Sequence, residues 1–247
     1  MISLTGIRRR WARALAIALV VFYIPWGARQ AFPPRNIAVS GVVSHIAVRD
    51  RVIALAFADG PQAAVINNLA DQGDQATFFV VGLNVERQRR QLKEARLLGN
   101  DIESHTLGHI NLAVHTYQQD LTDLARANQA IRRATGVAPH WLYPPYAAMS
   151  GPALAAARRL HLKVLLPAPA DRINADQASV AALVHQTMAR VRPGAVIVIH
   201  WGSRSAAFSQ ALPIILGLLR ARGYRVTSVA DLWTAAHATR SAESPRR

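Results

Sequence analysis

Short apolar runs alternate with longer amphipathic stretches over most of the chain. The apolar runs predict seven β-strands, at 52–57, 76–81, 100–103, 140–143, 163–166, 195–199 and 224–229. The amphipathic stretches predict helices at 84–98, 116–134, 151–160, 175–191 and 205–221. Strands that alternate with helices in this way favour a parallel α/β fold, as either a barrel or an open sheet.

The N-terminus follows a different pattern. Arginines at positions 8, 9, 10 and 13 precede an uncharged apolar run at 14–26. As a helix this run would be about 20 Å long, short of the ~30 Å hydrocarbon core of a bilayer, and such a length is typical of a signal peptide. A small-x-small cleavage site is hard to find after it. We therefore expect residues 1–35 to be a signal or anchor segment with a linker, retained in the membrane rather than cleaved.

Composition limits what the rest of the chain can be. The 247 residues are 51% apolar and 17% charged, which suits one large core and excludes a disordered or collagen-like chain. Cysteine is absent, which excludes disulfides, thiolate zinc sites and cysteine nucleophiles. We expect one domain at 36–236, followed by a basic, disordered tail at 237–247.

The strong positive charge lies mainly at the two ends of the chain. The formal net charge is +15, of which residues 1–35 carry +6 and residues 220–247 carry +4. The remaining +5 is spread over 36–219, with no interleaving of aromatic and basic residues of the kind that binds single-stranded nucleic acid. We therefore expect no nucleic-acid partner and interpret the N-terminal arginines as a membrane-topology signal.

Polar or conformationally special residues follow five of the predicted strands. In chain order these are Asp59 with Gly60, the segment 105–109, the segment 143–146, Asp171 and His200. In parallel α/β folds the carboxyl ends of the strands share one face, and chemistry is placed there. We expect these residues to converge.

Three of the residues at the strand ends have the chemistry of metal ligands. His105 and His109 are four residues apart, so their imidazoles would share one face of a helical turn. With the Asp59 carboxylate they form a facial ligand set that suits zinc or another divalent ion with positions open for water. Alternatively, Asp59 caps a helix. His200 is either a general acid at the mouth of the fold or a core histidine.

The order of these motifs resembles the polysaccharide deacetylase family, also called the NodB-homology domain or carbohydrate esterase family 4. The resemblance covers roughly residues 50–232 and lies in the segments Val52–Pro61, Ala76–Gly82, His105–His109 and Ile199-His200. It implies a distorted seven-stranded (β/α) barrel and one divalent metal ion, usually zinc. It also implies hydrolysis of acetyl groups from N-acetylglucosamine polymers or acetylated xylan.

The sequence departs from the family at the catalytic base. The family's first motif has two adjacent aspartates, the base and then a metal ligand, and here these positions are Ala58 and Asp59. The arginine that holds the base in relatives is Tyr143 here. Base and partner are therefore lost together.

Other family positions are kept. Pro145 and Tyr146 match the segment whose backbone N–H helps bind the oxyanion, and Asp171 is expected to match the aspartate that pairs with the acid His200. The tryptophan that usually follows that aspartate is Arg172. Glu103, two residues before the first metal histidine, would point to the same side of its strand and is a possible substitute base.

Two functions follow from this pattern. The first is an exported, metal-dependent deacetylase acting on an acetylated polysaccharide or peptidoglycan-like glycan, with an altered or missing general base. The second is an inactive relative that acts as a metal-stabilised glycan-binding or cell-envelope module. In both, we expect the protein to be extracytoplasmic, either anchored by its N-terminal segment or secreted if that segment is cleaved.

Overall fold

A computed structural model describes residues 41–176, 178–201 and 206–243 of the chain. The predicted signal or anchor segment at 1–35 lies outside the described residues. Within the described part, no helix is both long and apolar enough to cross a membrane.

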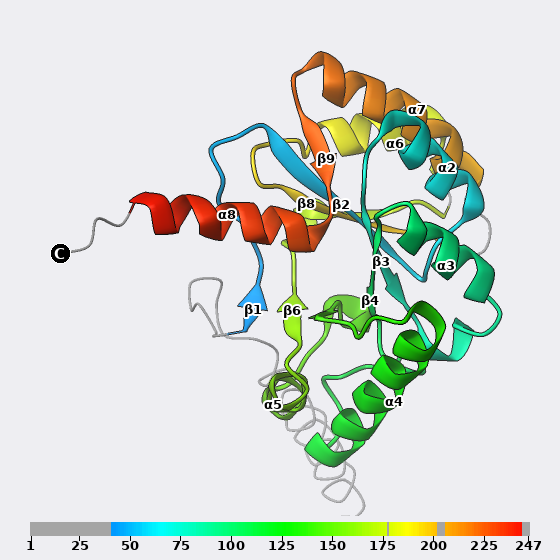
Figure 1. The fold of residues 1–247 in the computed structure, drawn as a ribbon, viewed down its shortest axis with the longest axis vertical. Helices are drawn as coiled ribbons and strands as arrows, with labels where there is room; N and C mark the ends of the chain where they lie inside the picture. Colours follow the sequence, from blue (N-terminus) through cyan, green and yellow to red (C-terminus); the bar gives the residue numbers. More distant parts are fainter. Residues whose placement is uncertain (1–40, 177, 202–205, 244–247) are drawn as a thin grey trace, which may run out of the picture.

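The described residues form an α/β fold around one sheet in which every pairing is parallel (Figure 1). Its strands are β1 (Val42–Val43), β2 (Val52–Ala58), β3 (Thr77–Val80), β4 (Asp101–Ser104), β5 (Trp141–Leu142), β6 (Lys163–Leu165), β7 (Arg172–Asn174), β8 (Val196–His200) and β9 (Arg225–Thr227). The order across the sheet is β1-β6-β5-β4-β3-β2-β8-β7, and β9 pairs with residues 52–54 of β2, on the side opposite to β8.

All seven predicted strands are confirmed, but the predicted distorted seven-stranded barrel is confirmed only in part. The structure adds β1 and β7, of two and three residues, which are too short to give a hydrophobic period. Among the described residues β1 and β7 are the two ends of the sheet and do not pair with each other. The seven-stranded barrel is therefore corrected to a curled, open half-barrel of nine parallel strands.

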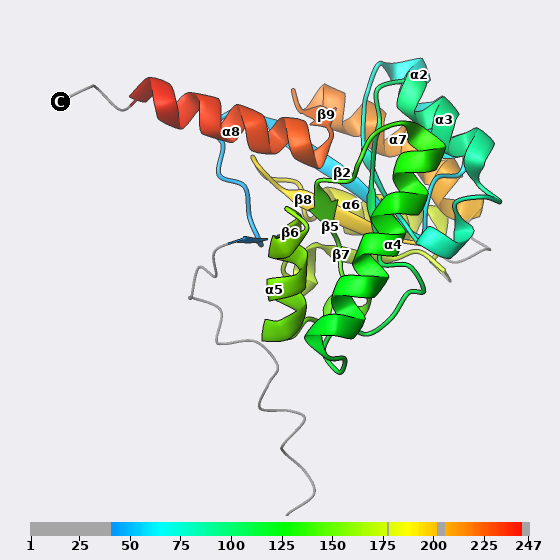
Figure 2. The same ribbon diagram turned by 60° about the horizontal axis from the view of Figure 1, so that its bottom comes forward.

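Helices cover the outer face of the curled sheet, except for the last one, which packs on its inner side. They are α2 (Ala63–Gln72), α3 (Arg89–Leu97), α4 (Tyr117–Thr135), α5 (Gly151–Arg159), α6 (Val180–Met188), α7 (Ala206–Ala221) and α8 (Val229–Glu243), with short 3-10 turns η2 (Gly82–Asn84), η3 (Pro145–Ala147) and η4 (Pro169–Asp171). Successive packing of α6 on α7, α7 on α2, α2 on α3, α3 on α4 and α4 on α5 makes a continuous belt (Figures 1 and 2). The five predicted helices are confirmed, with shorter ends for the segments starting at 84 and 175.

The C-terminal helix corrects a second expectation. Residues 237–243 were expected to be disordered, but α8 continues through them to Glu243. The first turns of α8 are anchored because Val229, Leu232 and Ala236 are buried inside the half-barrel. The far end of the helix extends away from the body of the protein (Figures 1 and 2).

Strand β2 divides the core into two sides. Its seven residues are all buried and alternate in direction, so Ile53, Leu55 and Phe57 join the outer core under the helices. The three alanines between and after them, at 54, 56 and 58, face the inner cluster that also holds Trp141 and Tyr143. Small residues on the inside of a curled sheet leave room for such large rings.

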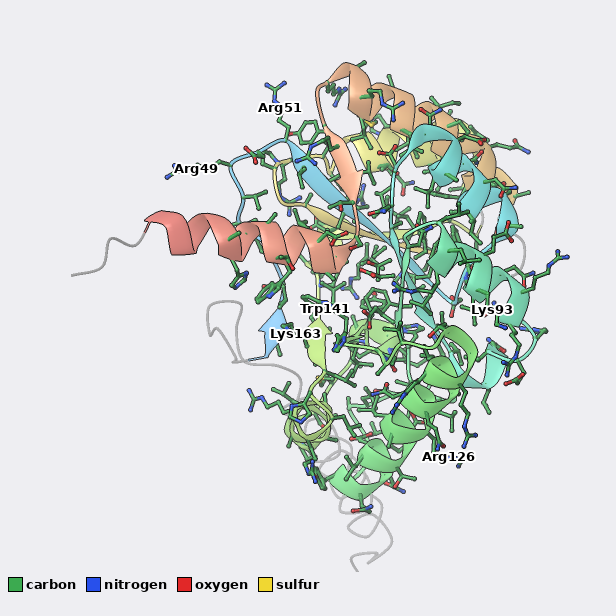
Figure 3. The ribbon with its side chains drawn as sticks, in the orientation of Figure 1. Arg49, Arg51, Lys93, Arg126, Trp141 and Lys163 are labelled. Atoms are coloured by element: carbon green, nitrogen blue, oxygen red, sulfur yellow. The ribbon has the colours of Figure 1, made fainter. Side chains whose placement is uncertain are left out.

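The cations of the domain are dispersed rather than gathered. Figure 3 shows Arg49, Arg51, Lys93 and Arg126 at the periphery, and the Arg51 guanidinium donates to the carbonyl of Arg222 at 3.0 Å. Lys163 is an exception among the labelled residues, because its ammonium lies 5.8 Å from the ring centroid of Trp141.

A carboxylic acid is buried at the start of α4. The Thr116 hydroxyl and Gln119 side chain form a capping box there, and the side chain of Asp120 in the first turn is fully buried. Neither oxygen of Asp120 has a hydrogen-bond partner among the described residues, and His115 Nδ1 lies 3.8 Å away. Burial raises the pKa of Asp120 to about 6, against the opposing charge of His115 and with the support of nearby Asp123.

This buried acid makes stability depend on pH. The pKa of Asp120 is higher in the folded protein than in the unfolded chain, so the folded state favours the neutral acid. The free energy of unfolding should therefore fall as pH rises from about 4 to about 7. We expect Asp120→Asn to lose this fall and to be more stable than wild type at pH 8, on the order of 2 kcal/mol.

Urea unfolding at pH 4.5 and pH 8 measures the effect. Asp71→Asn, an exposed position on α2, is the matched control and should leave the pH dependence unchanged. A wild-type profile that is flat over this range would show that burial of Asp120 has no such cost.

Candidate active site and metal centre

The loops that follow β2, β4, β5 and β8 meet at the carboxyl edge of the sheet. Register brings them together, since Ala58 at the end of β2 is opposite His200 on β8. Of the six described non-glycine residues with positive φ, five lie in these loops, at positions 59, 106, 109, 146 and 147. Strained backbone of this kind concentrates at functional sites, where the surrounding fold holds it in place.

The structure brings the three predicted metal ligands together. One ligand atom from each of Asp59, His105 and His109 lies within 4.8 Å of the others. His109 Nε2 is 3.8 Å from Asp59 Oδ1, and both side chains are about one-third exposed. The site is therefore open to solvent on one side and formed of carboxylate and imidazole groups, as a catalytic divalent ion requires.

The imidazole of His105 is oriented as a metal-binding histidine would be. The side chain is fully buried, and its Nδ1 lies 2.5 Å from the carbonyl oxygen of Tyr143, to which it donates. Nε2 is buried and has no hydrogen-bond partner among the described residues. Burial lowers the pKa of His105 to about 3, so the imidazole is neutral with a free lone pair on Nε2. A backbone carbonyl that fixes the tautomer in this way is typical of metal-bound histidine, so the residues present fit a divalent ion.

Side chains outside the ligand set hold the two ligand loops. Asp123 Oδ1 accepts the N–H of Leu107 at 2.8 Å, within the loop that carries both histidines. The Trp201 indole stacks on Phe57 at 4.5 Å between centroids, and its Nε1 donates to the carbonyl of Gly60 at 3.2 Å. Trp201 thus ties the end of β8 to the loop that carries Asp59. Sequence reasoning missed this role, for which an aromatic residue directly after a strand-end histidine was the available signal.

Tyr143 occupies the centre of the site. It is fully buried, its ring stacks on His105 with 5.3 Å between centroids and 5° between planes, and its hydroxyl lies 3.0 Å from His200 Nε2. Burial raises the pKa of Tyr143 to about 12, although the guanidinium of Arg172 lowers it through its charge and a hydrogen bond. Burial, then the charges of Arg172 and His109, lower the pKa of His200 to about 4, so this imidazole is neutral at pH 7.

The expected base position carries no titratable group. Ala58 is fully buried and belongs to the same inner cluster as Tyr143. The phenol ring therefore lies on the side of the sheet on which a carboxylate at position 58 would project.

Asp171 does not pair with His200 as predicted. Its two carboxylate oxygens accept from Arg192, at 2.8 and 2.7 Å, and the residue is only 3% exposed. A bidentate ion pair satisfies the carboxylate fully. His200 instead has the backbone of Ile173 as a hydrogen-bond partner, an interaction that raises its pKa slightly. Arg192 lies 21 residues after its partner in the loop before β8, and nothing in the sequence motif indicated it.

Glu103 is bound within the sheet. Its Oε2 accepts the backbone N–H groups of His140 and Trp141, at 2.7 and 2.8 Å, where β5 begins. The same burial that encloses this carboxyl raises its pKa to about 8. Because Oε2 already accepts two backbone N–H groups at the start of β5, the structure does not favour Glu103 as a substitute base.

The predicted oxyanion segment lies beside the ligands. Pro145 and Tyr146 form η3 directly after β5, and Tyr146 has a left-handed backbone with φ 60°. The Tyr146 ring is 65% exposed and meets the His109 ring edge-on at 5.1 Å between centroids. Its contribution to an oxyanion site stays a prediction.

Comparison with known proteins places this geometry in context. The sequence model of a family described as polysaccharide deacetylase matches residues 45–165. A peptidoglycan-N-acetylglucosamine deacetylase from Bacillus cereus is 25% identical over 187 residues, which are 73% of this chain and 68% of that protein. A bifunctional xylanase/xylan deacetylase from Cellvibrio japonicus is 31% identical over 175 residues, 69% of this chain but 26% of that protein.

Solved structures share the fold. A peptidoglycan N-acetylglucosamine deacetylase aligns with a TM-score of 0.71 at 22% identity, covering 78% of this chain and 93% of that one. A pseudoenzyme of carbohydrate esterase family 4 from Bacillus anthracis aligns with a TM-score of 0.68 at 18% identity, covering 78% of this chain and 69% of that one.

The ligand assignment predicts a specific loss of metal binding. Replacing His105 by alanine removes the buried Nε2 donor, so we expect His105→Ala to bind zinc at least 10-fold more weakly than wild type. Isothermal titration with zinc of protein first stripped by a chelator measures the affinity. His185→Ala, an exposed histidine on α6, is the control and should bind as wild type does. Equal affinity in all three proteins would remove His105 from the ligand set.

Proposed function

The chain belongs to the polysaccharide deacetylase family, and on that premise we propose that it is a metal-dependent hydrolase. Its reaction is the removal of acetyl groups from an N-acetylated glycan of the N-acetylglucosamine type, such as peptidoglycan. The observation that carries the proposal is the complete ligand set, in which Nε2 of His105 is buried and has no hydrogen-bond partner among the described residues, together with His200 nearby. A chain freed from all chemistry would have little reason to keep the acid histidine beside these ligands.

Asp59, His105 and His109 would hold the ion, for which zinc is our choice because one carboxylate and two imidazoles suit it. When bound, such an ion polarises a carbonyl oxygen and acidifies water. The chain's own contribution is to hold the His105 imidazole neutral and to fix its direction. The backbone N–H of Tyr146, which follows Pro145, would bind the oxygen of the acetyl carbonyl as charge develops on it.

Acid–base chemistry is where this chain differs from its relatives. Ala58 cannot accept a proton, and loss of a general base typically lowers rates about 10²–10⁴-fold. We therefore expect slow turnover rather than none. His200 is the group near the site that can give a proton to the leaving nitrogen after it has received one.

A location of the protein beside the glycan layer of a cell envelope would suit this activity. The arginine cluster and apolar run at 1–26 support export with the N-terminal segment kept as a membrane anchor. A cavity of about 420 Å³ beside the metal loop supports a polymeric substrate, because it is lined by apolar side chains, Leu107 and Ile110, together with polar ones, Gln118 and Arg126.

A second function has its own support. Ala58 and Tyr143 remove both the family's base and the arginine that holds it, which favours an inactive, metal-stabilised glycan-binding or cell-envelope module. The half-barrel would then be kept for its groove alone.

Acetate release from N-acetylated chito-oligosaccharides separates the two functions. We expect zinc-loaded wild type to release acetate slowly. Ala58→Asp combined with Tyr143→Arg, which restores the family's pair, should be faster by a factor of about 10²–10³, because a carboxylate base is regained.

His109→Ala serves as the inactive control for background hydrolysis. Wild type indistinguishable from this control, together with an active double variant and retained oligosaccharide binding, would favour the binding module. Equal rates in wild type and double variant would show that the missing base is of no consequence.

A further inference from the structure

Arg172 is a cation beside the site to which the proposed reaction assigns no role. It begins β7 at the end of the sheet, and the register places it opposite Val198, two residues before His200 on β8. Side chains alternate along a strand, and Ile173 belongs to the outer core, so Arg172 points to the inner side of the half-barrel. Val198 belongs to the inner cluster, so His200, two residues further on, shares that side with Arg172.

The guanidinium of Arg172 lies next to the Tyr143–His200 contact. It hydrogen-bonds the Tyr143 side chain, and its charge, after burial, is the second cause that lowers the pKa of His200. Because the Tyr143 hydroxyl is 3.0 Å from His200 Nε2, these contacts place the guanidinium near the carboxyl edge of the sheet, beside the candidate metal centre. Arg172 is only partly buried there, so part of it stays open to solvent.

No carboxylate of the described residues neutralises this guanidinium. The adjacent acid, Asp171, is bound by Arg192, and the ion pairs of the described residues do not include Arg172. The Arg172 Nε is buried and has no hydrogen-bond partner within the described part of the chain. A partly buried charge with incomplete hydrogen bonding costs free energy, and a divalent ion at the ligand set would add positive charge beside it. An anion bound at Arg172 would offset both effects.

A carboxylate is the anion that best fits this position. A guanidinium presents its N–H groups in a planar fork that matches the two oxygens of a carboxylate. Its single charge also balances that of a carboxylate, whereas a phosphate monoester carries nearly two charges at neutral pH. Arg172 bonds Tyr143, whose ring stacks on the ligand His105, so a carboxylate held there lies close to the reacting acetyl group. The two groups therefore belong to one sugar.

Resting on the deacetylase function proposed above, we propose that Arg172 is a specificity residue that pairs with a carboxylate on the sugar that carries the acetyl group. The preferred substrate unit is then an acidic derivative of N-acetylglucosamine, with a carboxylate substituent next to its acetamido group, rather than the neutral sugar. Holding that carboxylate also determines which acetamido group of the glycan lies at the metal ligands.

Two forms of one glycan that differ only in charge test the proposal. A peptidoglycan oligosaccharide with free lactyl carboxylates is compared with the same oligosaccharide after methyl esterification. We expect the zinc-loaded full-length protein to bind the free acid about 10- to 100-fold more tightly, the range that charge-assisted hydrogen bonds supply. Isothermal titration measures both dissociation constants, and added salt should reduce the difference because it screens the charges.

Substitutions of Arg172 separate its contribution from that of the metal ion. Arg172→Gln should bind acid and ester equally, whereas Arg172→Lys keeps the charge without the planar fork and should retain a smaller preference for the acid. Arg190→Gln is the matched control, because Arg190 follows α6 and is also partly buried with an Nε that lacks a partner among the described residues. It should keep the wild-type preference, and all variants should keep wild-type zinc content.

The outcomes separate this role of Arg172 from the function on which it rests. Equal affinity of wild type for acid and ester would overturn the proposal. A preference that survives in Arg172→Gln would also overturn it, because the carboxylate would then bind the metal ion instead. Acetate release from either oligosaccharide tests the deacetylase separately. An acid preference that needs Arg172, without any release of acetate, would overturn the deacetylase and uphold Arg172 as the carboxylate contact of a binding module.

Discussion

The hydrogen bond from His105 Nδ1 to the carbonyl of Tyr143 is the interaction on which the site depends. It joins the loop after β4 to the end of β5 and fixes which imidazole nitrogen is free. Without it, a fully buried histidine would have two ring nitrogens to satisfy and no defined direction. The same bond positions the backbone from which the Tyr143 hydroxyl reaches His200, so the candidate metal site and the Tyr143–His200 contact share one anchor point.

Most of the fold could be predicted because its strands are long enough to show a pattern. The seven-residue β2 is apolar throughout, as expected of a strand covered on both faces. By contrast, β1 and β7 have two and three residues and leave no period in the sequence. The turns of α8 that hold Val229, Leu232 and Ala236 do carry helical spacing, but the basic residues beyond them masked it. Closure of the sheet depends on pairing between distant strands, which hydrophobic patterns do not report.

The grouping of Asp59, His105 and His109 could be predicted because it depends on local features of the sequence. His105 and His109 are four apart, and Asp59 ends a recognisable strand, so spacing and strand order suffice. What failed depended on partners brought in by tertiary structure. Arg192 takes the carboxylate of Asp171, and Glu103 turns to the backbone of β5. The Tyr143–His200 contact joins residues 57 apart and needs both strand ends in place.

The open sheet has a consequence for whether the protein associates with other chains through its strand edges. A half-barrel that does not close leaves two strand edges, and an exposed edge is a template for pairing with another chain. Here each edge is minimal: β1 offers two residues, and β7 offers three, beginning with the charged Arg172. So short a run of free backbone groups cannot guide an incoming strand into register. The fold thus tolerates an open seam, and the access to solvent that goes with it, without becoming prone to edge-to-edge aggregation.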